Sequence, residues 1–278
     1  MQVHSIISNT ISEEVLKSGH LSIRFRTDGF SLLLEDANFK PVILNDFSND
    51  PYLSLAGHIQ QCEAWLEKHT LLNEFRGETS ILCDTPSETL IPEKFFSKDL
   101  QTSYLNSANS VGPNEIVKHR KIKSRPFVSV FAVPVQIIDL AKKFKSGSKI
   151  MHPVESMLSA ADQIDASEHQ RGFVMIETQA TSLEILVIKN DELVLSNRYK
   201  LKKPDEVVYH TLNSIKQLEL DRKKIPVYIS GLYKQDHEAI LLLGKYIKNV
   251  KPMPYFIRDI EKDTIPVNII LSEASKCE

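Results

Sequence analysis

Three acidic side chains fall where predicted strands turn or end, which is where carboxylates could hold metal ions. They are Asp28, Asp84 and Glu177. A nuclease that uses two metal ions needs such carboxylates clustered on the central strands of a sheet. Asp84 follows the apolar residues 81–83, which is a suitable position, but Arg26 occupies the corresponding part of the first strand. The pattern therefore does not favour a nuclease.

The strongest local concentration of charge is the basic run Lys118–Arg125. Lysine and arginine side chains in such a run could bind the phosphates of RNA or DNA. The run has no interleaved aromatic residues on which bases would stack. Lysines on an edge strand also discourage pairing with other sheets. We interpret the run as a solvated edge strand, with nucleic-acid binding as the alternative.

The nine histidines do not form a recognisable metal or acid–base motif. His58 and His69 are eleven residues apart, which places them roughly 16 Å apart along a continuous helix and excludes a shared metal ion. A structural role is predicted for each histidine, and His152 is the one to mutate first. The serine nucleophile elbow, the P-loop and the glycine-rich dinucleotide motif are absent from the sequence. We assign no catalytic residue and no metal ligand.

The composition is that of a globular protein. Of the 278 residues, 42% are hydrophobic and 25% are charged, which is enough apolar material for two cores. The formal net charge of -2 gives no general attraction to nucleic acid or anionic membranes. No stretch approaches the ~18 apolar residues that a membrane span needs. Residues 1–10 lack a basic start followed by an apolar run, so we expect no secretory signal. Three widely spaced cysteines give neither a disulfide framework nor a zinc site. We expect a cytoplasmic protein.

Hydrophobic periodicity in the first half predicts an antiparallel meander followed by a helix. Apolar and polar residues alternate over residues 21–26, which predicts a strand buried on one face. A turn at residues 27–29 leads to strands at residues 30–34 and 41–44. A helix is then predicted from about Pro51 to Asn73, with Asp50 as its cap.

The second half repeats this order. Strands are predicted at residues 173–176, 183–188 and 193–195, and a helix opens near Pro204. Equivalent residues keep a constant offset, so that Thr27 corresponds to Thr178 and Ser31 to Ser182. A duplicated supersecondary unit is the simplest explanation.

Each half closes with a strand, a helix and a short strand. In the first half these are residues 127–133, 135–144 and 149–151, and in the second half residues 227–229, 237–247 and 250–252. Such crossovers indicate parallel strands covered on both faces. The sequence therefore predicts an α/β protein with two duplicated lobes, each built on a mixed five-stranded sheet. We place the first lobe at residues 1–165, with a small inserted subdomain at about 85–125, and the second at residues 166–278.

A duplicated ribonuclease H-like unit is the hallmark of the superfamily that holds actin, sugar kinases and heat-shock chaperones. The chain resembles this actin-like ATPase superfamily over nearly its whole length. Residues 88–96, 130–134 and 151–155 resemble an uncharacterised bacterial family known as a domain of unknown function. A more distant likeness is to the actin-like platform proteins of type IV pili and type II secretion, which share the order of meander, helix, inserted subdomain and second lobe.

The resemblance implies where ATP and magnesium would bind. In the superfamily an Asp in each of two hairpins helps to hold the metal ion, while glycines and threonines approach the phosphates. Carried over to this chain, the cofactor-binding candidates in a cleft between the lobes are Thr27, Asp28, Gly29, Glu177, Thr178, Thr181 and Gly231.

All three nucleotide motifs depart from the superfamily pattern. In the first hairpin the strand-end position is Arg26, and Asp28 is displaced to the tip of the turn. The second hairpin has Glu177 in place of Asp and contains no glycine. The adenosine-side turn keeps Gly231 but has Leu232 where a second glycine is usual, and this bulk would crowd a purine.

These departures predict a non-catalytic or weakly nucleotide-binding protein that acts as a scaffold through protein partners. Two alternatives stay open. One is a working ATPase or small-molecule kinase with Asp28 or Glu177 on the metal ion. The other is an RNA-associated accessory protein that uses the basic run.

Overall fold

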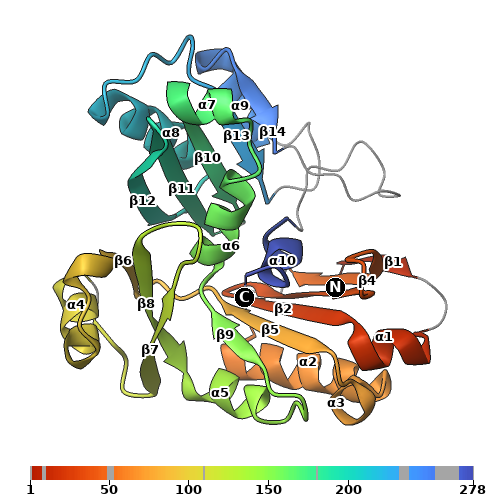
Figure 1. The fold of residues 1–278 in the computed structure, drawn as a ribbon. Helices are drawn as coiled ribbons and strands as arrows, with labels where there is room; N and C mark the ends of the chain where they lie inside the picture. The colour runs from red at the N-terminus through yellow and green to blue at the C-terminus, as the bar shows by residue number, and fades with distance from the viewer. Residues whose placement is uncertain are drawn as a thin grey trace. The chain divides into compact units, whose positions relative to one another are not determined.

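The computed structural model describes residues 2–7, 11–48, 53–108, 110–179, 181–231, 238–253 and 269–277. The chain forms two compact units (Figure 1). The first comprises Met1–Ser159 together with Ile270–Glu278, and the second comprises Ala160–Ile269.

The first unit is built on a six-stranded mixed sheet with the order β1-β4-β3-β2-β5-β9. Its strands are β1 (Gln2–Ile7), β2 (His20–Arg26), β3 (Gly29–Glu35), β4 (Pro41–Ser48), β5 (Glu78–Cys83) and β9 (Lys149–Met151). Strands β2, β3 and β4 form the predicted antiparallel meander, and β5 and β9 continue the sheet in parallel. The sequence did not predict β1, which adds a sixth strand by pairing with β4.

The helices of this unit are α1 (Glu13–Ser18), α2 (Leu55–Lys68), α3 (Leu71–Glu74), α5 (Val135–Ala141), α6 (Pro153–Ala161) and α10 (Ile269–Ala274). Helix α2 begins at Leu55 because Ser54 caps it: the Ser54 hydroxyl accepts a hydrogen bond from the Gly57 amide at 3.3 Å. The predicted start at Pro51 and its cap Asp50 lie outside the described residues.

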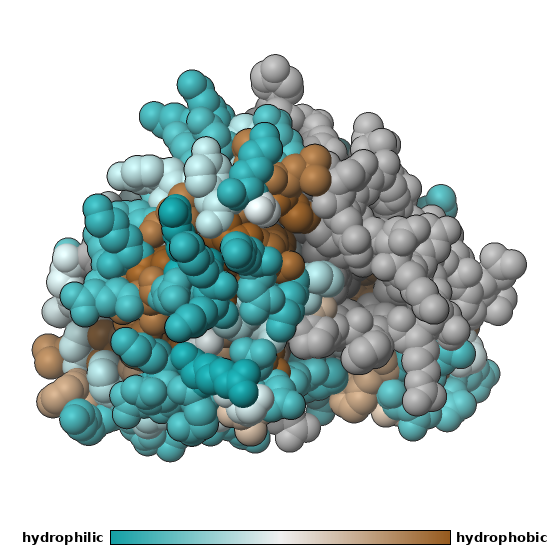
Figure 2. Space-filling model, turned by 90° about the horizontal axis from the view of Figure 1, so that it is seen from above, coloured by the Kyte–Doolittle hydropathy of each residue, from teal (hydrophilic) through white to brown (hydrophobic). Residues whose placement is uncertain are grey.

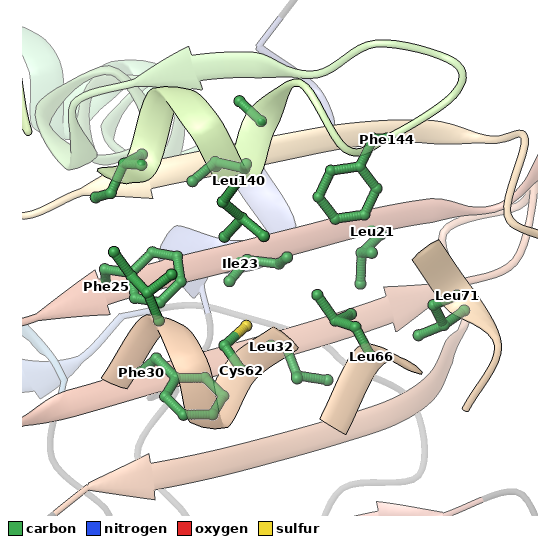
Figure 3. Packing of buried hydrophobic residues seen from close by; sticks show 14 of the residues in the cluster. Leu21, Ile23, Phe25, Phe30, Leu32, Cys62, Leu66, Leu71, Leu140 and Phe144 are labelled. Carbon is green, nitrogen blue, oxygen red and sulfur yellow. The ribbon is translucent and has the colours of Figure 1, made fainter. Parts of the chain in front are cut away.

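The main core lies between the first sheet and helices α2 and α5 (Figure 3). Alternation along β2 directs Leu21, Ile23 and Phe25 to this face, where Cys62 of α2 and Leu140 of α5 pack against the sheet. Fully burying a leucine or phenylalanine side chain contributes about 1.5–3 kcal/mol. Because successive side chains of a strand point to opposite faces, the residues of β2 that lie between these three point to the other face of the sheet.

A three-stranded sheet forms the small subdomain of the first unit, with the order β6-β8-β7. Its elements are β6 (Glu88–Pro92), η1 (Glu93–Phe95), η2 (Lys98–Leu100), α4 (Gln101–Ala108), β7 (Glu115–Lys121) and β8 (Phe127–Pro134). One face of β8 packs in the subdomain core with Leu105 of α4, while Phe131 and Val133 belong to the main core. The strand expected at residues 127–133 thus pairs in the small sheet, and β5 occupies the place beside β2 in the main sheet.

The second unit has a five-stranded mixed sheet with the order β12-β11-β10-β13-β14. Its elements are α7 (Ala166–Arg171), β10 (Phe173–Thr178), β11 (Ser182–Lys189), β12 (Glu192–Lys200), α8 (Asp205–Gln217), β13 (Val227–Ser230), α9 (Glu238–Tyr246) and β14 (Val250–Pro252). This order matches β4-β3-β2-β5-β9 of the first unit, strand for strand. The predicted duplication is confirmed. The expected start of α9 at His237 lies outside the described residues.

Hydrophilic residues cover much of the surface that is coloured in Figure 2, with hydrophobic residues visible between them. Among the helices that the structure describes, none combines the length and the apolar character needed to cross a bilayer.

Candidate functional site

The first candidate hairpin joins β2 to β3. Arg26 pairs with Gly29 across the hairpin, so that Thr27 and Asp28 form its turn. Asp28 is buried, whereas Thr27 is exposed. The assignment of these residues as ligands stays a prediction, and the one carboxylate among them is buried.

Arg26 holds the carboxylate of Asp28 in a buried ion pair. The guanidinium Nε lies 3.2 Å from Asp28 Oδ1, and Nη2 lies 2.7 Å from Asp46 Oδ1 on β4. Its Nη1 donates a hydrogen bond to the hydroxyl of Ser31 on β3. The side chains of Arg26, Asp28 and Asp46 are each less than a tenth exposed. One arginine thus satisfies acceptors on β3, β4 and the turn.

A second arginine on the same face of β2 holds the other candidate acid. Nε of Arg24 lies 2.8 Å from Asp84 Oδ1, and Nη2 lies 3.0 Å from Asp84 Oδ2. This is the bidentate geometry in which a guanidinium binds a carboxylate most strongly. We call Arg24, Arg26, Asp28, Asp46 and Asp84 the arginine–aspartate cluster.

The arginine–aspartate cluster does not provide the environment that a magnesium ion requires. Magnesium binds hard oxygen ligands, usually carboxylates with several waters. Here guanidinium groups already occupy the carboxylates of Asp28 and Asp84, and two positive charges lie beside them. The same contacts account for both acids that the sequence suggested as metal ligands in this unit.

The second candidate hairpin joins β10 to β11 and carries an acidic pair. Glu177 lies directly opposite Glu184 across the antiparallel strands and beside Ser230 of β13. Both glutamates are buried. Arg198 of β12 approaches this pair, with Nη1 3.5 Å from Glu184 Oε2 and Nη2 3.2 Å from the Ser182 hydroxyl. A guanidinium therefore partly offsets the acidic charge here as well.

The remaining candidates of the second unit surround the same hairpin. Thr178 is buried and Thr181 is exposed, and the carbonyl of Thr181 accepts a hydrogen bond from the Leu201 amide at 2.8 Å. Gly231 has a φ of +92°, and a Cβ at this position would lie 2.2 Å from the Thr178 carbonyl oxygen. Close backbone packing therefore requires a glycine here. Leu232, predicted to crowd a purine, lies outside the described residues.

Sequence reasoning did not identify Arg24, Asp46 or Arg198 as members of these sites. One indication was available. Arg24 and Arg26 alternate with Ile23 and Phe25 in a strand whose neighbours are apolar. A charged residue on a strand buried on both faces requires a buried partner of opposite charge.

Within the basic run, several side chains have partners inside the first unit. Arg120 Nε lies 2.9 Å from Glu155 Oε2, and Lys121 Nζ lies 2.6 Å from Glu93 Oε1. Nδ1 of His119 lies 2.9 Å from the side-chain oxygen of Gln101. These contacts bind β7 to its surroundings, so they reduce the positive charge that the run could offer to RNA.

His152 occupies a capping position before α6. Its Nδ1 accepts a hydrogen bond from the Val154 amide at 3.3 Å, and its Nε2 lies 3.2 Å from the Thr85 carbonyl oxygen. The side chain is fully buried. In the described part of the chain, no group of three or more His, Cys, Asp or Glu residues is placed to hold a metal ion.

A family model described as "Protein of unknown function (DUF3822)" matches residues 8–250. No curated protein matches the chain. A solved structure from Bacteroides thetaiotaomicron, described as a protein with actin-like ATPase fold and unknown function, is 18% identical with a TM-score of 0.76. That similarity covers 97% of this chain and 100% of the other.

Two further solved structures extend the comparison. The ethanolamine utilization protein EutJ from Carboxydothermus hydrogenoformans is 10% identical with a TM-score of 0.53, covering 98% of this chain and 93% of that one. A chain of the PilM–PilN type IV pilus biogenesis complex is 13% identical with a TM-score of 0.55, covering 92% and 97%. At these identities the comparisons show the fold alone. They confirm the predicted actin-like ATPase fold, which the PilM–PilN complex chain shares.

Proposed function

Because the chain belongs to the DUF3822 family and has the actin-like ATPase fold, we propose that it does not hydrolyse ATP and acts by binding protein partners. One observation carries this proposal. The carboxylate of Asp28, which lies at the hairpin expected to bind metal and phosphate, is held by the guanidinium of Arg26.

The energetics of the arginine–aspartate cluster oppose magnesium binding there. To coordinate a metal ion, Asp28 would have to leave Arg26, and a buried guanidinium would lose a partner. Removing one partner of a buried ion pair typically costs about 3–5 kcal/mol. A magnesium ion would also be repelled by Arg24 and Arg26. Binding of magnesium and ATP would have to offset both terms.

A partner-binding role is supported by the surface of the small subdomain. Phe95 is 65% exposed and Leu100 is 50% exposed, on the consecutive short turns η1 and η2. Phe96, by contrast, packs in the subdomain core. Aromatic side chains such as Phe95 are enriched at surfaces that bind other proteins. The PilM structure, which shares the fold, is a complex with PilN.

The proposal includes a cytoplasmic location. All three cysteines, Cys62, Cys83 and Cys277, are free thiols, and the first two are buried. Free thiols persist in a reducing compartment.

Calorimetric titration with ATP and magnesium tests the proposal, together with a phosphate-release assay. We expect no turnover, and any binding heat should be the same in the wild type, Asp28→Ala and Glu177→Ala. Tight binding with turnover that Asp28→Ala and Glu177→Ala both abolish, while the circular dichroism spectrum is retained, would instead establish an ATPase with Asp28 or Glu177 on the metal ion. Turnover unaffected by these variants would indicate a contaminating enzyme.

A further inference from the structure

A polar cavity of about 510 Å³ lies at the other end of the first sheet from the arginine–aspartate cluster. Strand β2 begins at His20 beside the cavity and ends at Arg26 in the cluster. At ~3.3 Å per residue, the seven residues of β2 separate the two places by roughly 20 Å. The cavity is therefore distinct from the hairpin that the nucleotide motifs identify.

The basic side chains of the cavity outnumber its acidic ones. Lys17, His20, Arg76 and Lys149 line it, and Glu78 is the acidic residue among its lining. Lys149 Nζ lies 3.2 Å from Glu78 Oε2, and both side chains are at least a third exposed. A pair that is this accessible is weak. The cavity therefore keeps an excess of positive charge.

Arg76 is oriented by the backbone carbonyls of two preceding residues. Its Nη1 donates to the Asn73 carbonyl at 2.8 Å and to the Phe75 carbonyl at 2.9 Å. Among the residues that the structure describes, Nε and Nη2 of Arg76 have no hydrogen-bond partner. A guanidinium held on one side and open on the other is suited to bind an oxyanion.

Residues 146–148 form one wall of the cavity and are fixed in place. The Ser146 hydroxyl donates to the Gly77 carbonyl at 2.8 Å, and the Ser148 hydroxyl donates to the Ala141 carbonyl at 3.0 Å. Gly147 between them has a φ of +79°, a conformation that favours glycine. The wall is therefore formed before any ligand arrives.

We propose that this cavity binds a small molecule bearing a phosphate group, with Arg76 and Lys149 as the main cations. A phosphate monoester offers three acceptor oxygens and close to two negative charges, which match several donors better than a carboxylate does. The cavity volume falls within the ~300–1,000 Å³ typical of small-molecule sites, so it accommodates more than the phosphate itself. This site is independent of the function proposed above.

Titration of the full chain with inorganic phosphate at low ionic strength, followed by calorimetry and by NMR, tests the proposal without any nucleotide. We expect saturable binding in which acetate competes poorly. Arg76→Ala and Lys149→Ala should each weaken phosphate binding about tenfold, because each removes a charged hydrogen bond. Glu78→Gln should strengthen it, because it removes the opposing carboxylate. Lys142→Ala, on an exposed lysine outside the cavity lining, is the matched control and should leave binding unchanged.

Absence of saturable phosphate binding would overturn the proposal. So would equal affinity in the wild type, Arg76→Ala and Lys149→Ala, or equal affinity for acetate and phosphate. Arg76→Ala could unfold the protein, because its guanidinium also binds backbone carbonyls. Lys149→Ala and Glu78→Gln alter accessible side chains, so their opposite effects on affinity provide the decisive comparison in a folded protein.

Discussion

Arg26 and Asp28 stand two residues apart in one hairpin, with Nε and Oδ1 3.2 Å apart and both side chains buried. The same guanidinium reaches Asp46 on β4 at 2.7 Å. A strand end that would carry a metal-binding carboxylate in an ATPase of this fold thus carries the cation that neutralises its neighbours. These ion pairs link the turn of the hairpin to β4.

Replacing Arg26 should therefore destabilise the protein strongly. Arg26→Met would leave Asp28 and Asp46 buried with a lost partner, and we expect the free energy of unfolding to fall by about 3–5 kcal/mol. Urea unfolding followed by circular dichroism measures this. Lys123→Ala, at an exposed position, is the control and should change stability by less than about 0.5 kcal/mol. A loss as small as that for Arg26→Met would show that the ion pairs contribute little.

Gly231→Ala should destabilise the second unit, because the new Cβ would meet the Thr178 carbonyl oxygen at 2.2 Å and φ is positive. We expect a loss of more than about 1 kcal/mol. Gly244→Ala in α9 is the matched control, since a Cβ there meets nothing within 4 Å. In a helix this substitution should raise stability by about 0.4–1 kcal/mol. Equal thermal midpoints for the two variants would contradict the packing described for Gly231.

Glu35 should make the first unit less stable as pH rises towards neutrality. Burial raises the pKa of Glu35 to about 7, although hydrogen bonds from Ser275 and Ser272 oppose the shift. Between its ordinary pKa of 4.5 and about 7, the folded state binds a proton that the unfolded state has released. The free energy of unfolding therefore falls with pH across this window, by on the order of 1–3 kcal/mol.

Glu35→Gln removes this titration while keeping a side chain that can bond Ser272 and Ser275. Chemical unfolding of the wild type and Glu35→Gln at about pH 5 and about pH 8 compares the two slopes. We expect a shallower pH dependence in the variant and a gain in stability at the higher pH. Parallel slopes would show that Glu35 does not titrate in this range.

The thiol of Cys277 should react slowly in the folded protein, although its side chain is only partly buried. Burial raises the pKa of this thiol to about 11, and the carboxylate of Glu155 adds to the shift. Because the thiolate is the reactive form, little of it exists at neutral pH. Labelling with an aromatic disulfide reagent should be much slower than for free cysteine. In urea, all three cysteines should react at the rate of free cysteine.

Local patterns were sufficient to predict the repeated meander of β2, β3 and β4 and of β10, β11 and β12. Alternation with a period of two specifies a strand and its buried face without knowledge of its neighbours. Pairing was harder to predict. Residues 127–133 are apolar on both faces, so their sequence does not reveal that β8 joins the small sheet. Strand β1 exists by pairing with β4, forty residues away in the chain, and its own six residues do not specify that partner.

The residues that contact one another in the candidate site also come from distant parts of the sequence. Arg24 meets Asp84 sixty residues later in the sequence, and Ser275 meets Glu35 across 240 residues. No spacing rule links such pairs. The sequence showed that the nucleotide motifs were altered at Arg26 and Glu177. The contacts that stabilise the altered residues became visible only with the fold.

The arginine–aspartate cluster also restricts which substitutions its strand end can accept. A change of Arg26 to an acidic residue would add a third carboxylate beside Asp28 and Asp46, in a site where like charges repel strongly. An acidic residue in place of Arg26 alone would therefore give a less stable protein. A metal site at this strand end would need further changes in the buried charges around Asp28 and Asp46.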